Sequence, residues 1–186
     1  MFHSLFNPIA LPSYEFLKLH EGKGNYAISK YYRFPFRPFY RKKLYMIRDL
    51  LDEKRIYDNI LDFGSGPGIF EKELKRHALK VAAVDKGDQI DPRARFECIV
   101  CASSLEFVDD LDDTVGKLYK ATHPKGQIII GSPMDSALAK AYFWLIGDKK
   151  PRHKPDEIVK AVKRKYLVSE YREWAGLYFA LRAYKP

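Results

Sequence analysis

The stretch NILDFGSGPGIF, residues 59–70, decides the fold because a short apolar run leads directly into three glycines at alternate positions. The run 59–63 is typical of a buried strand that ends where the glycines begin. Glycine weakens regular elements, so three of them within five residues indicate a turn that a ligand approaches closely. The following segment, 69–78, has acids first and bases last, which favours a helix.

The rest of the chain alternates strand and helix patterns around this stretch. Apolar runs predict three further buried strands, at 80–85, 96–104 and 127–132. Helical patterns lie at 38–51, 109–123, 135–146 and 155–165, and a turn is expected at 123–126. Strands that are apolar throughout need cover on both faces, which indicates a mostly parallel sheet inside an α/β sandwich. Two final runs around Gly176 predict an antiparallel hairpin at its edge.

The length of 186 residues fits a single domain, which we divide into three parts. Residues 1–55 form an N-terminal cap that is irregular and then helical, and residues 56–133 form a ligand-binding core. Residues 134–186 add further helices and the hairpin.

The composition favours a cytoplasmic protein. No basic segment precedes the first apolar stretch, so a signal peptide is not expected, and the run AYFWLIG (141–147) is too short to span a bilayer. The two cysteines, Cys98 and Cys101, lie in a predicted strand, where residues three apart point to opposite faces. No second pair accompanies them, so we expect neither a metal site nor a disulfide framework.

The formal net charge of +9 is unevenly distributed. Residues 1–58 carry a net +5 and residues 147–186 a net +6, whereas residues 59–146 carry −2. Basic flanks around a nearly neutral core can attract RNA, an acidic lipid headgroup or an anionic small molecule. A merely solubilising surface is the other interpretation.

The motifs together resemble those of class I S-adenosylmethionine-dependent methyltransferases. LDFGSGPG resembles the first motif of that family, an acid followed by alternating glycines, and VAAVD (81–85) resembles the second. Residues 96–133 look like the family's fourth strand, following helix and fifth strand. The acid that opens the loop, Asp62, also suits a positively charged ligand group better than a pyrophosphate. The resemblance implies a Rossmann-like fold and an enzyme whose cofactor is S-adenosyl-L-methionine.

Carried over residue by residue, the resemblance implies a set of cofactor contacts. Asp62 and the glycine loop would hold the methionine end, Asp85 would accept hydrogen bonds from both ribose hydroxyls, and Lys86 would lie beside the adenine. The end of the next strand would line the pocket near the sulfonium. The complete expected set is Asp62, Phe63, Gly64, Ser65, Gly66, Gly68, Asp85, Lys86, Cys101, Ala102 and Ser103. A plain tight turn at the glycines and a helix cap at Asp85 remain the structural alternative.

The sequence departs from the family in one segment. Only residues 86–95 separate Asp85 from Phe96, and ten residues cannot hold a crossover helix and a strand. We therefore expect the sheet to lack the family's third strand and the adenine site to be more open, with Asp88 or Gln89 as substitute adenine contacts. Phe107 stands where the family often has histidine.

Methyl transfer from a sulfonium mainly requires alignment, so no catalytic triad is expected. His153, in the basic loop after the apolar helix, is the candidate base. Aromatic residues at 26–40 and 142–144 suit a flat, small or lipid-like acceptor, and contact with an anionic membrane stays open. The alternatives are an RNA methyltransferase, because aromatics alternate with arginines, and a non-catalytic binding or scaffold protein.

Overall fold

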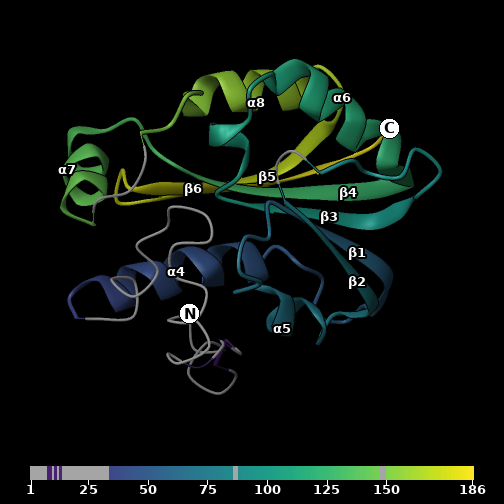
Figure 1. Ribbon diagram of the computed structural model, residues 1–186, viewed down its shortest axis with the longest axis horizontal. Coiled ribbons are helices and arrows are strands. Elements are labelled where there is room, and N and C mark those ends of the chain that lie inside the picture. The colour runs from purple at the N-terminus through teal and green to yellow at the C-terminus, as the bar shows by residue number, and fades with distance from the viewer. Residues whose placement is uncertain (1–7, 10, 12, 14–33, 86–87, 147–149) are drawn as a thin grey trace.

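The computed structural model describes residues 8–9, 11, 13, 34–85, 88–146 and 150–186, and these form a six-stranded sheet (Figure 1). The strand order is β2-β1-β3-β4-β6-β5. Neighbouring strands from β2 to β4 pair in parallel, whereas β6 is antiparallel to both β4 and β5. This confirms the mostly parallel sheet with a C-terminal hairpin. The strands are β1 (Tyr57–Phe63), β2 (Ala78–Val84), β3 (Phe96–Ala102), β4 (Thr122–Pro133), β5 (Leu167–Trp174) and β6 (Tyr178–Tyr184).

Helices cover both faces of the sheet, as all-apolar parallel strands require. In Figure 1, α4 (Phe36–Arg48) and α5 (Glu71–Leu74) lie below the sheet, and α6 (Leu111–Ala121) and α8 (Pro155–Lys163) lie above it. The short helix η1 (Leu105–Phe107) follows β3, and α7 (Ala137–Ile146) lies beyond one end of the strands. Among these described helices, none is both long and apolar enough to cross a membrane.

Alternation along the strands divides the buried side chains between two cores. Ile60, Cys98 and Ile129 belong to the core under α4 and α5, whereas Leu61, Cys101 and Ile128 belong to the core under α6 and α8. Successive strand residues point to opposite faces, which is why the two cysteines lie in different cores. Both thiols are buried, and burial raises the pKa of Cys98 to about 12.

The largest differences between predicted and observed elements are at α5 and at the start of β4. The helix expected at 69–78 is a single turn, α5, because the chain must return to begin β2 at Ala78 opposite Tyr57. The turn expected at 123–126 lies inside β4, which starts at Thr122. Lys125 has a turn-like φ of 62°, and the pairing of β3 with β4 shifts register there. The expected turn is therefore present as an irregularity within the strand.

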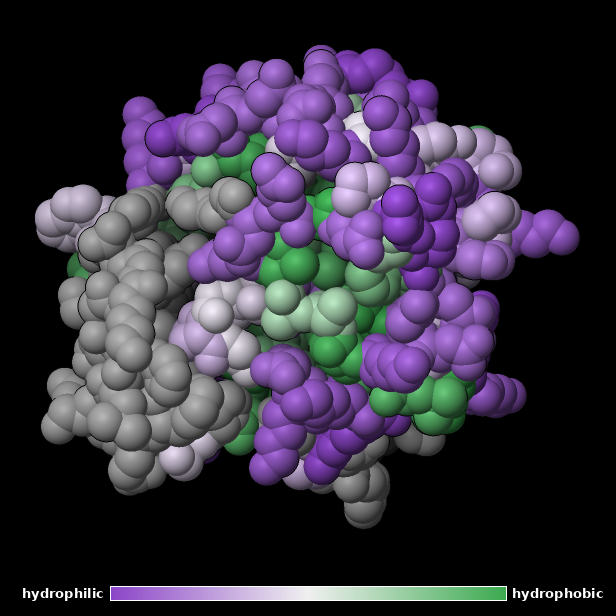
Figure 2. Space-filling model, turned by 45° about the vertical axis from the view of Figure 1, so that its right-hand side comes forward, coloured by the Kyte–Doolittle hydropathy of each residue, from purple (hydrophilic) through white to green (hydrophobic). Residues whose placement is uncertain are grey.

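The third strand of the family is missing, as expected from the short connection after β2. The described residues between β2 and β3 form no helix or strand, and β2 is the edge of the sheet. Figure 2 brings the β1–β2 side forward and shows hydrophobic side chains in the middle of this face between hydrophilic rims. On this edge, β2 exposes 73% of Leu79.

Candidate functional site

The glycine loop lies at the carboxyl end of β1, the strand beside the edge strand β2. Gly64, Gly66 and Gly68 have φ values of 76°, 51° and 73°. A Cβ added at Gly64 would lie 2.2 Å from the Cβ of Ser104, so both the conformation and the close packing require glycine there. The Gly64 amide donates to the carbonyl of Val84 at 2.7 Å and ties the loop to the end of β2. The loop thus has a defined backbone path that brings its surface to a pocket.

Asp62 directs a buried carboxylate into that pocket. Only 2% of the residue is exposed, and its Oδ2 has no hydrogen-bond partner within the described part of the chain. Burial, and secondarily the negative charge of Glu71, raise the pKa of Asp62 to about 7. A buried carboxyl without a partner is costly, so this oxygen is suited to a ligand that brings a positive charge.

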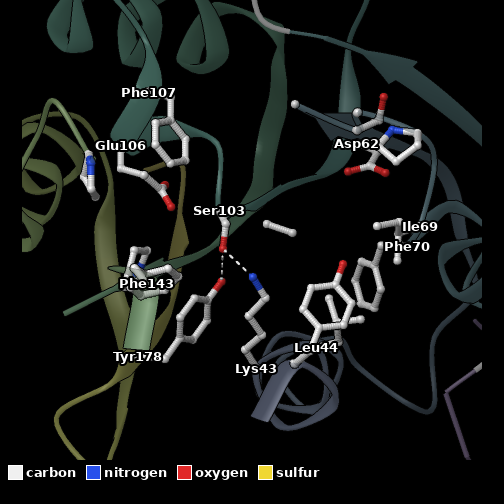
Figure 3. A pocket seen from close by; sticks show the side chains of 18 residues that line it. Lys43, Leu44, Asp62, Ile69, Phe70, Ser103, Glu106, Phe107, Phe143 and Tyr178 are labelled. Atoms are coloured by element: carbon white, nitrogen blue, oxygen red, sulfur yellow. Dashed lines mark hydrogen bonds between the residues drawn. The ribbon is translucent and has the colours of Figure 1, made fainter. Parts of the chain in front are cut away.

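The pocket joins the loop to α4, to the ends of β3 and β4, and to the start of β6. Figure 3 shows its side chains. Its described lining is mostly apolar and aromatic, with a few polar groups, and consists of Tyr40, Lys43, Leu44, Asp62, Gly64, Ser65, Gly66, Pro67, Ile69, Phe70, Ala102, Ser103, Glu106, Phe107, Pro133, Phe143, Pro151 and Tyr178. Such a lining is typical of a site for a small organic molecule.

Ser103 is the centre of the polar contacts on the pocket wall. It has a φ of 60°, a conformation that costs a non-glycine residue about 1–2 kcal/mol. Its amide donates to the carbonyl of Gly131 at 2.8 Å, and its Oγ lies 2.9 Å from the hydroxyl of Tyr178. The ammonium of Lys43 donates to the same Oγ at 3.4 Å (Figure 3). Strain held by several contacts at a pocket wall is typical of a binding site.

The structure brings together six of the predicted cofactor contacts, Asp62, Gly64, Ser65, Gly66, Ala102 and Ser103, all in the pocket lining. Gly68 closes the loop through its amide, which donates to the carbonyl of Ser65 at 2.9 Å. Asp85 is exposed at the carboxyl end of β2, where its amide donates to Asp88 at 3.0 Å. Phe63 and Cys101 lie in the core under α6 and α8, outside this described lining. Lys86 lies outside the described residues.

His153 lies near the pocket without being part of its described lining. Its Nε2 is 2.9 Å from the carbonyl of Val108, and its Nδ1 is 3.9 Å from Glu157 in α8. These contacts orient the imidazole toward the loop after η1 and toward the start of α8. The role of His153 as a base therefore stays a prediction, and neither of these two contacts supports it.

A second hollow continues from the pocket toward α6. Phe107 lines both hollows, and the second is also lined by Phe63, Val108 and the segment 88–92. Asp88 and Gln89, the expected substitutes for the missing adenine contact, are in this lining. The two hollows together can accommodate an elongated ligand along the carboxyl ends of the strands.

Three polar side chains of the pocket were missed from the sequence: those of Lys43, Glu106 and Tyr178. Lys43 has a detectable signal, because it lies three residues after Tyr40 and four before Ile47, on the stripe of α4 that faces the protein interior. Glu106 follows the carboxyl end of β3 closely, which is also a recognisable position. Tyr178 has no local signal, because only the antiparallel pairing of β6 with β4 places it beside Pro133.

A family model identifies the family of the chain, and solved structures identify its fold. A family model described as a methyltransferase domain matches residues 29–175. No curated protein matches the sequence significantly.

Solved structures share the fold at low sequence identity. The N-methyltransferase NodS from Bradyrhizobium japonicum WM9, in complex with S-adenosyl-L-homocysteine, is 17% identical with a TM-score of 0.65, over 80% of this chain and 88% of that one. The 1,6-didemethyltoxoflavin-N1-methyltransferase from Burkholderia thailandensis is 13% identical with a TM-score of 0.62, over 96% and 92%. The [4+2]-cyclase SpnF, 11% identical, has a TM-score of 0.59 over 83% of each chain. Identities this low establish the fold alone, and the cyclase shows that the fold can carry another reaction.

Proposed function

Because the chain belongs to the class I S-adenosylmethionine-dependent methyltransferase family, we propose that it transfers the methyl group of S-adenosyl-L-methionine to a small or lipid-like acceptor bound in the pocket beside Ser103. The observation that carries this proposal is the buried Asp62 carboxylate, whose Oδ2 lacks a partner in the described residues and lines a pocket with the glycine loop.

The residues of the loop fit the methionine end of the cofactor. Asp62 would accept the ammonium, and the left-handed backbone at Gly64 and Gly66 would let the ligand contact main-chain groups. Asp85 would hold the ribose, since the bond from Gly64 to Val84 puts the ends of β1 and β2 together. The hollow lined by Phe107 and Gln89 would take the adenine, with the segment 88–92 in place of the missing third strand. When bound, the cofactor supplies an activated methyl group.

The other part of the pocket suits an apolar acceptor. Pro133, Phe143 and Pro151 form its wall, and the Ser103–Tyr178 hydroxyl pair supplies a polar contact that can orient an acceptor group. These side chains would exclude water and align the nucleophile with the methyl group, which is the main requirement of a direct displacement. Burial keeps the pKa of Tyr178 well above its ordinary value, so its hydroxyl acts in this role as a hydrogen-bonding group.

Helix α7 favours a lipid-like acceptor. Phe143 lines the pocket, whereas Leu138, Trp144 and Leu145 are 57%, 79% and 58% exposed on the same helix. A helix that is apolar also on its exposed side is suited to an interfacial environment. We expect vesicles containing anionic phosphatidylglycerol to bind the protein better than neutral phosphatidylcholine vesicles. Equal binding to both would contradict the role of the basic flanks.

A shallow basic hollow on α4 is the observation that favours RNA. It is lined by Arg37, Arg41, Lys42 and Tyr45. If this surface binds RNA, log K should fall by about 0.7 per neutralised phosphate for each tenfold rise in salt. RNA binding that persists at physiological salt and is lost in Arg37→Ala/Arg41→Ala would move the protein into the RNA-modifying class.

Cofactor binding is the primary test, because it separates an enzyme from a non-catalytic relative with an empty site. A hundredfold excess of S-adenosyl-L-methionine over Kd should raise the free energy of unfolding by about 2.7 kcal/mol. Gly66→Val should lose this increase, since valine is strained at a φ of 51° and would fill the ligand's position. An unchanged unfolding transition in the native protein would refute the proposal.

A further inference from the structure

Two buried tyrosines, Tyr166 and Tyr178, each share a hydrogen bond with another hydroxyl group. Tyr166 belongs to the core under α6 and α8, and its hydroxyl oxygen is 2.8 Å from Thr122 Oγ1. Tyr178 lines the pocket, and its hydroxyl oxygen is 2.9 Å from Ser103 Oγ. Both tyrosines are only 2% exposed, so each hydroxyl needs its partner within the protein or in a ligand.

The hydrogens of the Thr122–Tyr166 pair are both used within the protein. The Thr122 hydroxyl donates to the carbonyl of Leu118 at 2.8 Å. Because a hydroxyl has only one hydrogen, the bond between the two side chains must be donated by Tyr166 to Thr122. This pair is therefore complete without a ligand.

The Ser103–Tyr178 pair has one hydrogen more than it can use. Ser103 Oγ accepts from the Lys43 ammonium at 3.4 Å, and its other hydrogen bond is with Tyr178 (Figure 3). One hydroxyl donates to the other, and the second hydrogen has no acceptor among the described residues. Further contacts of Lys43 do not change this result, because an ammonium has no lone pair that could accept the hydrogen. Burial keeps the pKa of Tyr178 well above its ordinary value, so the phenol retains its hydrogen at neutral pH.

The backbone fixes this pair on the pocket wall. The Ser103 amide donates to the carbonyl of Gly131 at 2.8 Å. Gly131 also leaves room for the phenol, since a Cβ added there would lie 2.5 Å from the Tyr178 hydroxyl. In Figure 3 the two hydroxyls lie between Phe143 and Lys43, and all four residues line the pocket. A hydroxyl hydrogen at a fixed place in the lining specifies where a ligand should supply a lone pair.

We propose that the Ser103–Tyr178 pair donates this hydrogen to a carbonyl oxygen of the methyl acceptor, which is then a ketone, an amide or an ester. This inference rests on the proposed function and names the chemical class of its acceptor. A carbonyl oxygen supplies lone pairs only, whereas a hydroxyl or an ammonium would bring hydrogens of its own. The neighbouring wall of Pro133, Phe143 and Pro151 is apolar, so an uncharged oxygen enters at a lower desolvation cost than a carboxylate.

Two fluorinated ligands of nearly equal shape test the proposal by fluorine NMR titration. para-Fluoroacetophenone has a carbonyl oxygen, and para-fluoro-α-methylstyrene has a methylene group in its place. We expect the native protein to bind the ketone about tenfold more tightly, because only the ketone accepts the hydrogen. Ser103→Ala or Tyr178→Phe alone leaves one hydroxyl hydrogen in the pocket and should keep part of this preference. The double variant Ser103→Ala/Tyr178→Phe should bind both ligands equally.

Thr122→Val/Tyr166→Phe is the matched control, because it removes the other buried pair of hydroxyls and should keep the full preference for the ketone. Equal binding or no binding of the two ligands by the native protein would overturn the inference, and this result does not depend on the folding of a variant. A preference that persists in Ser103→Ala/Tyr178→Phe would overturn it as well. The titrations need no cofactor, so a native protein that prefers the ketone but does not bind S-adenosyl-L-methionine would contradict the proposed function alone.

Discussion

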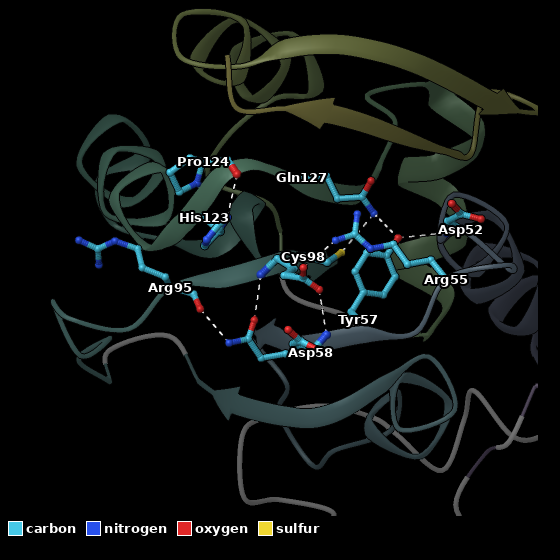
Figure 4. Close-up of polar contacts among 11 residues, drawn as sticks. Asp52, Arg55, Tyr57, Asp58, Arg95, Cys98, His123, Pro124 and Gln127 are labelled. Carbon is cyan, nitrogen blue, oxygen red and sulfur yellow. Dashed lines mark hydrogen bonds and ion pairs between the residues drawn. The ribbon is translucent and has the colours of Figure 1, made fainter.

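The two ends of the parallel strands differ in how their buried polar groups are hydrogen-bonded. At the amino ends, the buried hydroxyl of Tyr57 accepts from Gln127 at 2.7 Å and from the Asp52 amide at 3.2 Å (Figure 4). Nearby, Glu97 accepts from Arg55 at 2.7 Å and from the Asp58 amide at 2.8 Å. These polar groups therefore have their hydrogen-bond partners within the protein.

At the carboxyl ends, buried polar atoms lack such partners. Within the described residues, Asp62 Oδ2 and Ser132 Oγ have no hydrogen-bond partner, and Ser103 adopts a strained backbone conformation. We infer from this difference that the amino ends contribute stability, and it agrees with our proposal of a ligand site at the carboxyl ends, where stability is lost. Variants at the amino ends should therefore change the unfolding free energy, and variants at the carboxyl ends should change ligand affinity.

The largest expected effect is on affinity, at the carboxyl end. Asp62→Asn should weaken binding of S-adenosyl-L-homocysteine about 100-fold, because a charge-assisted hydrogen bond to the ammonium is lost. The unfolding free energy without ligand should be equal or higher at pH 8, since a buried charge is removed. Calorimetry and urea denaturation measure the two quantities. A large loss of stability with native affinity would reverse the comparison.

The next effect is on stability, at the amino end. Tyr57→Phe should lower the unfolding free energy by about 1–3 kcal/mol, because Gln127 and the Asp52 amide lose a buried partner. Ligand affinity should not change. Urea denaturation measures the loss, and Tyr184→Phe, at an exposed position, is the control. If Tyr57→Phe were as stable as the native protein, the hydroxyl network would not be a source of stability.

The pH dependence of stability and of binding tests the carboxyl end separately, because it reports the ionisation of Asp62. Its pKa is about 7 in the folded protein without ligand and about 4 in an unfolded chain. The folded state therefore retains the proton longer, and the contribution of Asp62 to stability is complete below pH 4 and lost as pH rises through 7.

Binding of the ammonium needs the ionised carboxylate and has the opposite trend. Affinity for S-adenosyl-L-homocysteine should rise up to tenfold per pH unit below about pH 7 and level off above it. Calorimetric titrations from pH 5.5 to 8.5 measure this profile. Asp62→Asn should flatten it, and a profile that is already flat in the native protein would exclude titration of Asp62 on binding.

The smallest effect is expected at the Arg55–Glu97 pair. The Arg55 side chain is 49% exposed and that of Glu97 is 25% exposed, so solvent screens their attraction. Arg55→Ala should lower the unfolding free energy by at most about 0.5 kcal/mol, measured by urea denaturation beside Tyr57→Phe. A loss as large as that of Tyr57→Phe would show that the ion pair, and not the buried hydroxyl, stabilises the amino ends.

Much of this architecture could be predicted because it depends on local patterns. The alternating glycines after β1 predicted the loop, and the position of Asp62 near the end of that strand made it a candidate partner for a positively charged ligand group. The ten residues between Asp85 and Phe96 predicted a sheet with one strand fewer, because chain length limits what a connection can hold. Helix length was predicted less well: α5 is one turn because the pairing of Ala78 with Tyr57 ends it.

By itself, then, the sequence determined the strand–loop–helix order, the glycine loop and the separation of Cys98 from Cys101, since each follows from steric preference or from alternation over a few residues. Only the tertiary structure decided which distant side chains complete the pocket. Lys43 and Tyr178 meet at Ser103 from α4 and β6, segments that are 60 and 75 residues from Ser103 in the chain. No local pattern specifies such a meeting, because it depends on strand order and on the packing of α4 against the sheet.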